Sequence, residues 1–285
     1  MSSASINPTV RRRRLGSELR RLREARGLTA EEVAAQLLVS QSKISRLENG
    51  RRSISQRDVR DLCGVYGVTD ETMIEGLMAM ARESRQRGWW HAFGDLPYSV
   101  YIGLEDEAAS IRTYESLLIP GLLQTRDYAR AAIAGIQPDR DAEAVERRAE
   151  VRMRRQERVT GDNPVEFWAV IDEAALRRIV GSPEVMRQQL EQLAAFCELP
   201  HVNLQVIGFS AGAHPGMSGA FSILEFPESA DTAVVYLEGV TSDLYLEKES
   251  DVRRYTGLYE HLRATALSPA DSRVVIGKIA KEHAQ

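Results

Sequence analysis

The segment from Leu28 to Arg52 constrains the fold of this chain more than any other part of the sequence. Its apolar residues recur at intervals of three, four and seven positions: Val33, Leu37, Ile44 and Leu47. This spacing predicts two short helices that share one buried face. Thr29 and Glu32 have the spacing of a capping box, so we expect Thr29 to start the first helix. Ser40 can cap the second helix.

The second of these helices carries polar and basic side chains on its other face. Such side chains donate hydrogen bonds to phosphates and base edges, and an α-helix fits the major groove of DNA. The alternative is a pair of amphipathic helices with a solvated face, and the sequence favours the DNA-binding interpretation. The predicted DNA contacts are Thr29, Gln41, Ser42, Lys43, Ser45, Arg46, Asn49, Arg51 and Arg52.

A further helix is predicted over residues 11–27, with leucines on one face and Gly27 at its end. With this helix, "VSQSKISRLENGRR" and the arginine-rich opening, residues 13–80 resemble the lambda-repressor-like helix-turn-helix domain of xenobiotic-response-element-type regulators. The resemblance implies that an arginine of the first helix, here Arg23, pairs with the glutamate of "LENG", here Glu48. Ala30 stands where many members have a DNA-contacting glutamine, which removes one expected contact.

Capping residues and apolar spacing predict two more helices, over residues 56–66 and 70–83. We therefore expect a five-helix DNA-binding domain at 11–83, preceded by a disordered N-terminus at 1–10. Residues 84–96 form a predicted linker that contains Trp89, Trp90 and Phe93. These aromatic side chains either pack at the domain junction or contact nucleic acid or a partner, and the sequence favours packing.

The charge of the chain is distributed unevenly along its length. Residues 1–60 hold fourteen Lys or Arg and six Asp or Glu, a net charge of +8, whereas the remaining residues have a net charge of −12. A basic module joined to an acidic body is typical of a regulator that binds DNA with one end only.

Several classes of protein are not supported by the sequence. The N-terminal residues lack the apolar core of a signal peptide, and no run of eighteen apolar residues could cross a membrane. We therefore expect a cytoplasmic protein that joins the nucleoid when bound to DNA. Cys63 and Cys197 lie far from each other and from any histidine at metal-ligand spacing, so no metal or cofactor is expected.

Residues 97–285 are predicted to form a larger α+β domain. Six segments have the composition of strands: 110–118, 165–171, 202–209, 220–226, 233–237 and 243–247. Five segments have the pattern of helices: 125–135, 141–160, 182–199, 249–267 and 269–283. The helix at 141–160 is densely charged and is predicted to lie on the surface.

The string "IPGLLQTRDYARA" at 119–131 and four other strings in the same order give this domain a second resemblance. From about residue 90 to residue 273 it resembles the C-terminal domain of unknown function of actinobacterial antitoxin-like transcriptional regulators. The resemblance implies a regulator that acts with a small acidic partner protein encoded nearby, as an antitoxin acts with a toxin.

The sequence gives little support for catalysis in this domain. Acidic strings such as Asp172-Glu173 do not by themselves supply the converging oxygens that metal-dependent hydrolysis needs. The glycine-rich run at 208–219 lacks a phosphate-binding signature and precedes a strand. It is predicted to be a mobile loop, rather than a lid over a pocket, with His214 exposed.

Together these features predict a multidomain protein with an α-helical DNA-binding domain and an α+β body. The expected function is sequence-specific transcriptional regulation as a homodimer on double-stranded DNA, with the body dimerising and binding a partner protein. An alternative is a regulator whose body senses a small-molecule ligand. A DNA-targeted enzyme is a remote third possibility.

Overall fold

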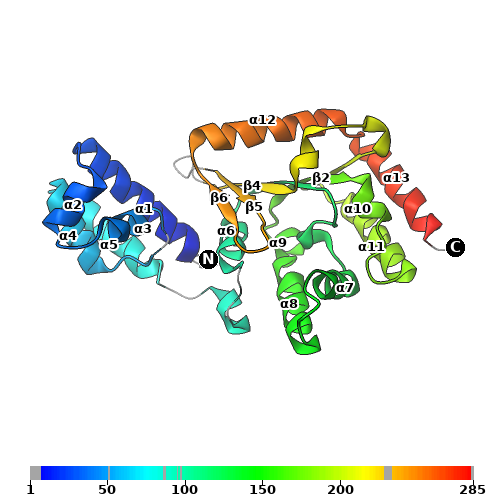
Figure 1. Ribbon diagram of the computed structural model, residues 1–285, viewed down its shortest axis with the longest axis horizontal. Coiled ribbons are helices and arrows are strands. Elements are labelled where there is room, and N and C mark those ends of the chain that lie inside the picture. The colour runs from blue at the N-terminus through cyan, green and yellow to red at the C-terminus, as the bar shows by residue number, and fades with distance from the viewer. Residues whose placement is uncertain are drawn as a thin grey trace. The chain divides into compact units, whose positions relative to one another are not determined.

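The computed structural model describes residues 8–50, 52–85, 88–94, 96, 98–227 and 233–283. The chain divides into two compact units, residues 1–107 and 108–285. Figure 1 shows helices alone in the first unit and a sheet flanked by helices in the second.

The first unit begins with five helices: α1 (Pro8–Ala25), α2 (Ala30–Gln36), α3 (Gln41–Glu48), α4 (Gln56–Tyr66) and α5 (Glu71–Glu83). They confirm the predicted five-helix fold, and their starts follow local capping chemistry. The side chains of Thr29, Ser40, Ser55 and Asp70 each accept a backbone N–H of the helix that follows. Gly67, with φ of +70°, ends α4 in the left-handed conformation that favours glycine.

The apolar residues of these helices form one core. Leu15 and Leu19 of α1 are fully buried against Val33 of α2, Ile44 of α3 and Leu62 of α4. After α5 come the 3₁₀ segment η1 (Trp89–Phe93) and helix α6 (Ser99–Glu107), which the sequence did not predict. In η1 the Trp89 ring meets those of Trp90 and Phe93 edge to face, with centroids 5.9 and 6.0 Å apart.

The second unit contains a six-stranded mixed sheet in the order β3-β2-β1-β4-β5-β6. Its strands are β1 (Ser110–Glu115), β2 (Glu166–Asp172), β3 (Val202–Ile207), β4 (Phe221–Glu225), β5 (Val234–Leu237) and β6 (Leu244–Leu246). β1, β2 and β3 are parallel, while β4 runs antiparallel to β1, β5 to β4, and β6 to β5. All six predicted strands are therefore present.

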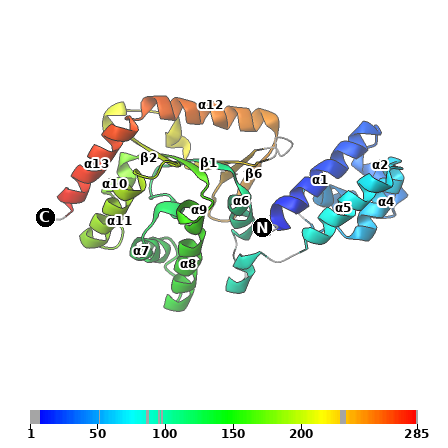
Figure 2. The ribbon, with the colours of Figure 1, turned by 180° about the vertical axis from the view of Figure 1, so that it is seen from behind.

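The helices of this unit are α7 (Arg126–Ile136), α8 (Ala142–Arg155), α9 (Glu157–Thr160), α10 (Glu173–Arg177), α11 (Pro183–Phe196), α12 (Glu249–Thr265) and α13 (Pro269–Glu282). Short 3₁₀ turns are η2 (Gly121–Leu123), η3 (Phe209–Ala211) and η4 (Pro215–Ser218). Figures 1 and 2 show α12 along one face of the sheet and α7, α8 and α11 on the other side.

Apolar packing and hydrogen bonds attach α12 and α13 to the sheet. Tyr259 and Leu262 of α12 are buried against Tyr114, Val170 and Ile223 of the sheet. The outer edge of β3 is covered by the α12–α13 connection, since Leu267 N donates to Val206 O and Val206 N donates to Ser272 Oγ, both at 2.9 Å. This cover protects an edge strand that could otherwise pair with another chain.

The prediction of a single surface helix over residues 141–160 is wrong in two respects. The helix is interrupted at Gln156, and α8 buries Arg148 and Arg155 along with Ala149 and Val151. Guanidinium groups can be buried here because they find polar partners: Arg148 Nη1, for example, donates to Gln137 Oε1 at 2.7 Å.

Candidate nucleic-acid interface

The first turn of α2 and the first turn of α3 are each fixed by an N-terminal cap. Thr29 N donates to Glu32 Oε2 at 2.7 Å, and Glu32 N donates to Thr29 Oγ1 at 3.2 Å, which completes a capping box. Lys43 N donates to Ser40 Oγ at 3.2 Å. Because these bonds satisfy backbone donors at each helix start, the direction of α3 is set locally.

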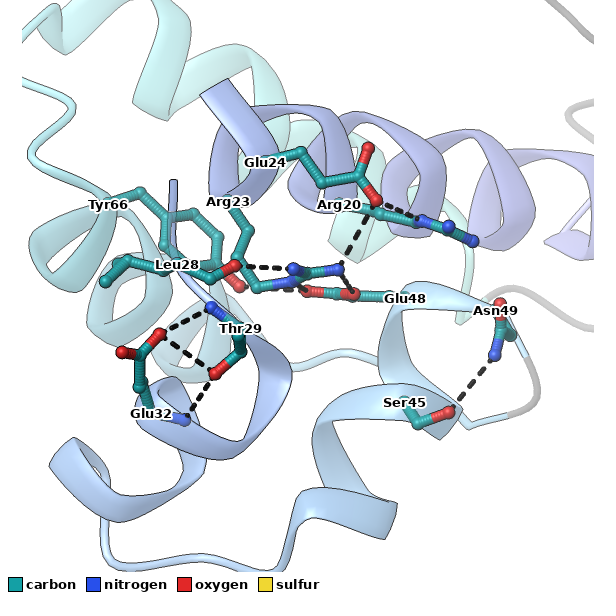
Figure 3. A network of polar contacts seen from close by, with 10 residues as sticks. All are labelled: Arg20, Arg23, Glu24, Leu28, Thr29, Glu32, Ser45, Glu48, Asn49 and Tyr66. Atoms are coloured by element: carbon teal, nitrogen blue, oxygen red, sulfur yellow. Dashed lines mark hydrogen bonds and ion pairs between the residues drawn. The ribbon is translucent and has the colours of Figure 1, made fainter. Parts of the chain in front are cut away.

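Arg23 and Glu48 hold α1 against the end of α3. Arg23 Nε lies 2.8 Å from Glu48 Oε1, and Arg23 Nη2 lies 3.0 Å from Glu48 Oε2. Arg23 Nη1 also donates to the carbonyl of Leu28 at 2.7 Å, and the Tyr66 hydroxyl donates to Glu48 Oε1 at 3.2 Å. Figure 3 shows the Arg23 guanidinium between the Glu48 carboxylate and the Leu28 carbonyl.

This network is partly removed from solvent, with 11% of the Arg23 side chain and 4% of the Glu48 side chain exposed. The hydrogen bond to Glu48 raises the pKa of Arg23. Burial, together with the Glu48 charge, raises the pKa of Tyr66. Both shifts keep Arg23 cationic and Tyr66 a hydrogen-bond donor at neutral pH.

Two glycines allow α1 and α3 to approach this closely. A Cβ atom on Gly16 would lie 2.5 Å from the carbonyl oxygen of Glu48, and one on Gly50 would lie 2.9 Å from the Cα of Arg13. Gly50 also has φ of +63°. Neither position was predicted from the sequence, although Gly16 is an isolated glycine inside a helical pattern, which can mark close packing.

The outward face of α3 carries most of the predicted DNA contacts. Gln41, Ser42, Arg46 and Asn49 are exposed, and Lys43 and Ser45 are partly exposed. Thr29 and Arg52 are exposed as well, whereas Arg51 lies outside the described residues. These side chains supply hydrogen-bond donors on one surface of the helix-turn-helix, which is the arrangement that a DNA groove and its phosphates require.

Most of these side chains already have partners on the protein, among them Lys43, Arg46 and Asn49. Lys43 Nζ donates to Asp58 Oδ1 of α4 at 2.9 Å, and Arg46 Nε donates to the carbonyl of Ser42 at 3.1 Å. Asn49 Nδ2 donates to Ser45 Oγ at 3.2 Å. Although burial alone would raise it, hydrogen bonds from Ser55 and Lys43 lower the pKa of Asp58. No local pattern in the sequence predicts that Asp58 pairs with Lys43.

Leu38, in the turn between α2 and α3, has an unfavourable backbone conformation. Its φ is +53°, the only positive φ of a non-glycine residue in the described part of the chain, and 93% of the residue is exposed. The left-handed region costs a residue with a Cβ about 1–2 kcal/mol. The strained backbone of Leu38 therefore lowers the stability of this turn, and its exposed side chain makes few contacts that could offset the strain.

The candidate carboxylates of the second unit have structural partners. Asp172 Oδ1 accepts Ala174 N at the start of α10, and Glu173 Oε2 accepts Phe209 N at 2.9 Å. His214 Nε2 lies 3.2 Å from Asp172 Oδ2, and only 6% of its side chain is exposed. The expected exposure of His214 is therefore wrong, because its loop folds back over β1 and β2.

No group of three or more His, Cys, Asp or Glu side chains in the described residues could hold a metal ion. Within the same part of the chain, every helix is too short or too polar to span a membrane.

Comparison with known proteins places both units. Residues 14–75 match the model of a helix-turn-helix domain. Over 64 residues the chain is 34% identical to the HTH-type transcriptional regulator DdrOP3 of Deinococcus deserti, which covers 22% of this chain and 50% of that protein. The chain thus spans about half the length of this curated relative. No solved structure matches the chain.

The first unit therefore contains a helix-turn-helix DNA-binding domain. Residues 98–278, more than half of the chain, match the model of the domain of unknown function DUF5753. The chain belongs to the DUF5753 family, and it carries this domain behind a helix-turn-helix DNA-binding domain.

Proposed function

We propose that this chain regulates transcription by binding a specific DNA sequence as a homodimer, with α3 as its recognition helix. The observation that carries the proposal is the exposed row of Gln41, Ser42, Arg46 and Asn49 on a helix fixed to α1 by Arg23 and Glu48. Gln41 and Arg46 read base edges, Lys43 exchanges Asp58 for a base or a phosphate, and Thr29, Arg51 and Arg52 hold phosphates.

We infer a homodimer because a single helix-turn-helix domain binds DNA weakly. One helix-turn-helix contacts only a half-site, and joining two copies raises the effective concentration of the second contact. The body at 97–285 supplies the joining surface, while the segment at 84–96 links it to the DNA-binding domain at 11–83. The acidic balance of the body keeps it from binding DNA by itself.

Selection of random DNA duplexes by the full chain tests this proposal. We expect the enriched sequences to contain a repeated half-site, and the complex to contain two copies of the chain per duplex. A non-repeated site occupied by one copy would contradict the homodimer, and an absence of any enriched sequence would contradict specific binding.

We further propose that the body binds a small partner protein, in the manner of an antitoxin-like regulator. The order of motifs in residues 98–278 supports this role, and the partner is expected to be acidic and encoded nearby. The alternative role is binding of a small-molecule ligand, since ligands of α/β proteins often lie beyond the carboxyl ends of parallel strands such as β1, β2 and β3.

Purification of the full chain from its own cells, followed by mass spectrometry of proteins and small molecules that remain bound, separates these two roles. A stoichiometric small protein is the expected result. A bound metabolite without a protein would replace the partner-binding role by ligand sensing.

A further inference from the structure

The strand directions bring several distant loops to one edge of the sheet. β1, β2 and β3 are parallel and all end at this edge, and β5 ends there too because it is antiparallel to β4, which is antiparallel to β1. β4 and β6 begin at the same edge. The segments that meet there are 115–125, 172–173, 208–220 and 238–244.

These loops expose large apolar side chains. Five residues are each more than half exposed, and we call them the apolar edge: Leu117, Phe209, Met217, Val240 and Leu244. In the described residues, the loops at the opposite ends of the strands expose no large apolar side chain of this kind. Exposed apolar side chains gathered on one side of a molecule are typical of an interaction surface.

The loops that carry the apolar edge are held in place by hydrogen bonds. Phe209 N donates to Glu173 Oε2, His214 bonds Asp172, and Gly239 N donates to Asp243 Oδ1 at 3.3 Å. Gly216 lies flat on the Tyr114 ring, where a Cβ atom would come within 2.4 Å of the ring. A surface fixed in this way loses less conformational entropy when a partner binds.

The charged side chains of the four segments themselves have one sign, although Arg152 of α8 lies beside the segment 115–125, where its Nη1 donates to Gln124 Oε1. The four segments contain five carboxylates and no Lys or Arg. His214 engages Asp172 and Arg177 engages Glu173, whereas Glu238 and Asp243 make no ion pair in the described part of the chain. Glu115 adds little charge at neutral pH, because burial and the nearby Glu238 raise its pKa to about 8. DNA would bring phosphates against these carboxylates, and a second copy of the edge would bring the same carboxylates, so neither is a favourable occupant.

We propose that the apolar edge docks a segment of a partner protein in which two or three large apolar side chains are accompanied by Lys or Arg. The inference rests on the partner-binding role proposed above and adds where the partner docks and which chemistry its docking segment has, whatever the net charge of the whole partner. The edge crosses five strand spacings, about 24 Å, which an extended segment of about seven residues can span.

Selection of displayed random 12-residue peptides on the immobilised full chain tests the proposal. The variant Phe209→Ser/Val240→Ser removes two side chains of the apolar edge. Its matched control, Ile136→Ser/Val274→Ser, removes two apolar side chains from α7 and α13 that are also more than half exposed. We expect peptides rich in large apolar residues and in Lys or Arg, bound equally by the wild type and the control. Binding should fall at least tenfold for the edge variant and severalfold for Glu238→Lys.

Selected peptides that bind the edge variant as tightly as the wild type, peptides that are acidic, or no enrichment at all would each overturn the docking surface. The natural partner is recovered separately by co-purification, so these failures leave the partner-binding role standing. Conversely, a chain that purifies without a partner but still selects basic apolar peptides through Phe209 and Val240 keeps the surface and removes the proposed antitoxin-like role.

Discussion

Arg23 of α1 and Glu48 of α3 form a bidentate ion pair, with both nitrogen–oxygen distances at or below 3.0 Å and both side chains mostly buried. The same carboxylate accepts the hydroxyl of Tyr66 from α4. One glutamate thereby connects three helices, and it lies directly before Asn49 at the end of α3. We expect the stability of the DNA-binding domain and the orientation of α3 to depend on this pair.

A double-mutant cycle of Arg23→Ala and Glu48→Ala measures the pair. Each single substitution leaves a mostly buried charge without its partner, so we expect each to lower the free energy of unfolding by about 3–5 kcal/mol. The double variant should lose less than the sum. Urea unfolding of the full chain provides the measurement, with Arg20→Ala as a control, because the exposed Arg20–Glu24 pair should contribute less than about 1 kcal/mol. Additive losses would show that Arg23 and Glu48 do not interact.

Arg46→Ala tests readout by α3. If Arg46 pairs with guanine, the loss should be about 1–3 kcal/mol on the selected site and should relax one position of that site. Affinity for selected and random duplexes gives the comparison, with Arg57→Ala on the exposed surface of α4 as the control. An equal loss on both kinds of DNA would make Arg46 a phosphate contact.

Replacing Arg51 and Arg52 by alanine should weaken binding to every sequence. Each lost phosphate contact retains about one counterion, so the slope of log affinity against log salt concentration should flatten by about 0.9 per arginine. Titrations at several salt concentrations measure this slope. If it stays unchanged, the phosphate contacts lie elsewhere, and the arginines at 11–14 are the next candidates.

Leu38→Gly should stabilise the first unit. Glycine adopts the left-handed conformation of this turn without steric cost, and no buried contact is lost because the leucine is 93% exposed. Relief of about 1–2 kcal/mol of backbone strain outweighs the roughly 0.4–1 kcal/mol by which the greater freedom of glycine stabilises the unfolded chain. We therefore expect a net gain of up to about 1 kcal/mol in thermal or urea unfolding. Leu38→Ala is the control, since it shortens the side chain but keeps the strained Cβ. A loss of stability in Leu38→Gly would show that the exposed leucine makes a stabilising contact.

Glu115, at the end of β1, should make the second unit less stable as pH rises. Burial, together with the nearby Glu238 carboxylate, raises the pKa of Glu115 to about 8. Above its ordinary pKa of about 4.3, the unfolded chain releases a proton that the folded chain keeps. The stability is therefore full below about pH 4.3 and is lost as pH rises to about 8, by up to about 1.4 kcal/mol per pH unit.

Hydrogen exchange of peptides that contain β1 and β5, measured between pH 5 and pH 9 after correction for the intrinsic exchange rate, tests this dependence. Glu115→Gln should flatten it, because the amide stays neutral throughout. The control Glu249→Gln removes an exposed carboxylate at the start of α12 and should leave the dependence as it is. The same dependence in Glu115→Gln and the wild type would assign it to another group.

Local chemistry explains which elements the sequence predicted. Thr29, Ser40 and Ser55 mark helix starts because each side chain satisfies a backbone donor three residues away. The strands at 202–207 and 234–237 were predicted because β-branched and apolar residues favour the pleated backbone. The sequence does not predict α6, or α10, which has only five residues although Asp172 caps it.

Tertiary structure alone decided the features that depend on distant partners. The sequence determined that α3 begins after Ser40 and has a polar face, but it did not determine that Lys43 bonds Asp58, fifteen residues away. Burial of Arg148 and His214 depends on Gln137 and Asp172, which the fold brings to them. Likewise, the apolar edge gathers loops up to 127 residues apart, from Leu117 to Leu244. Those loops meet because strand order and direction are set by packing of the whole sheet, and no local pattern encodes that packing.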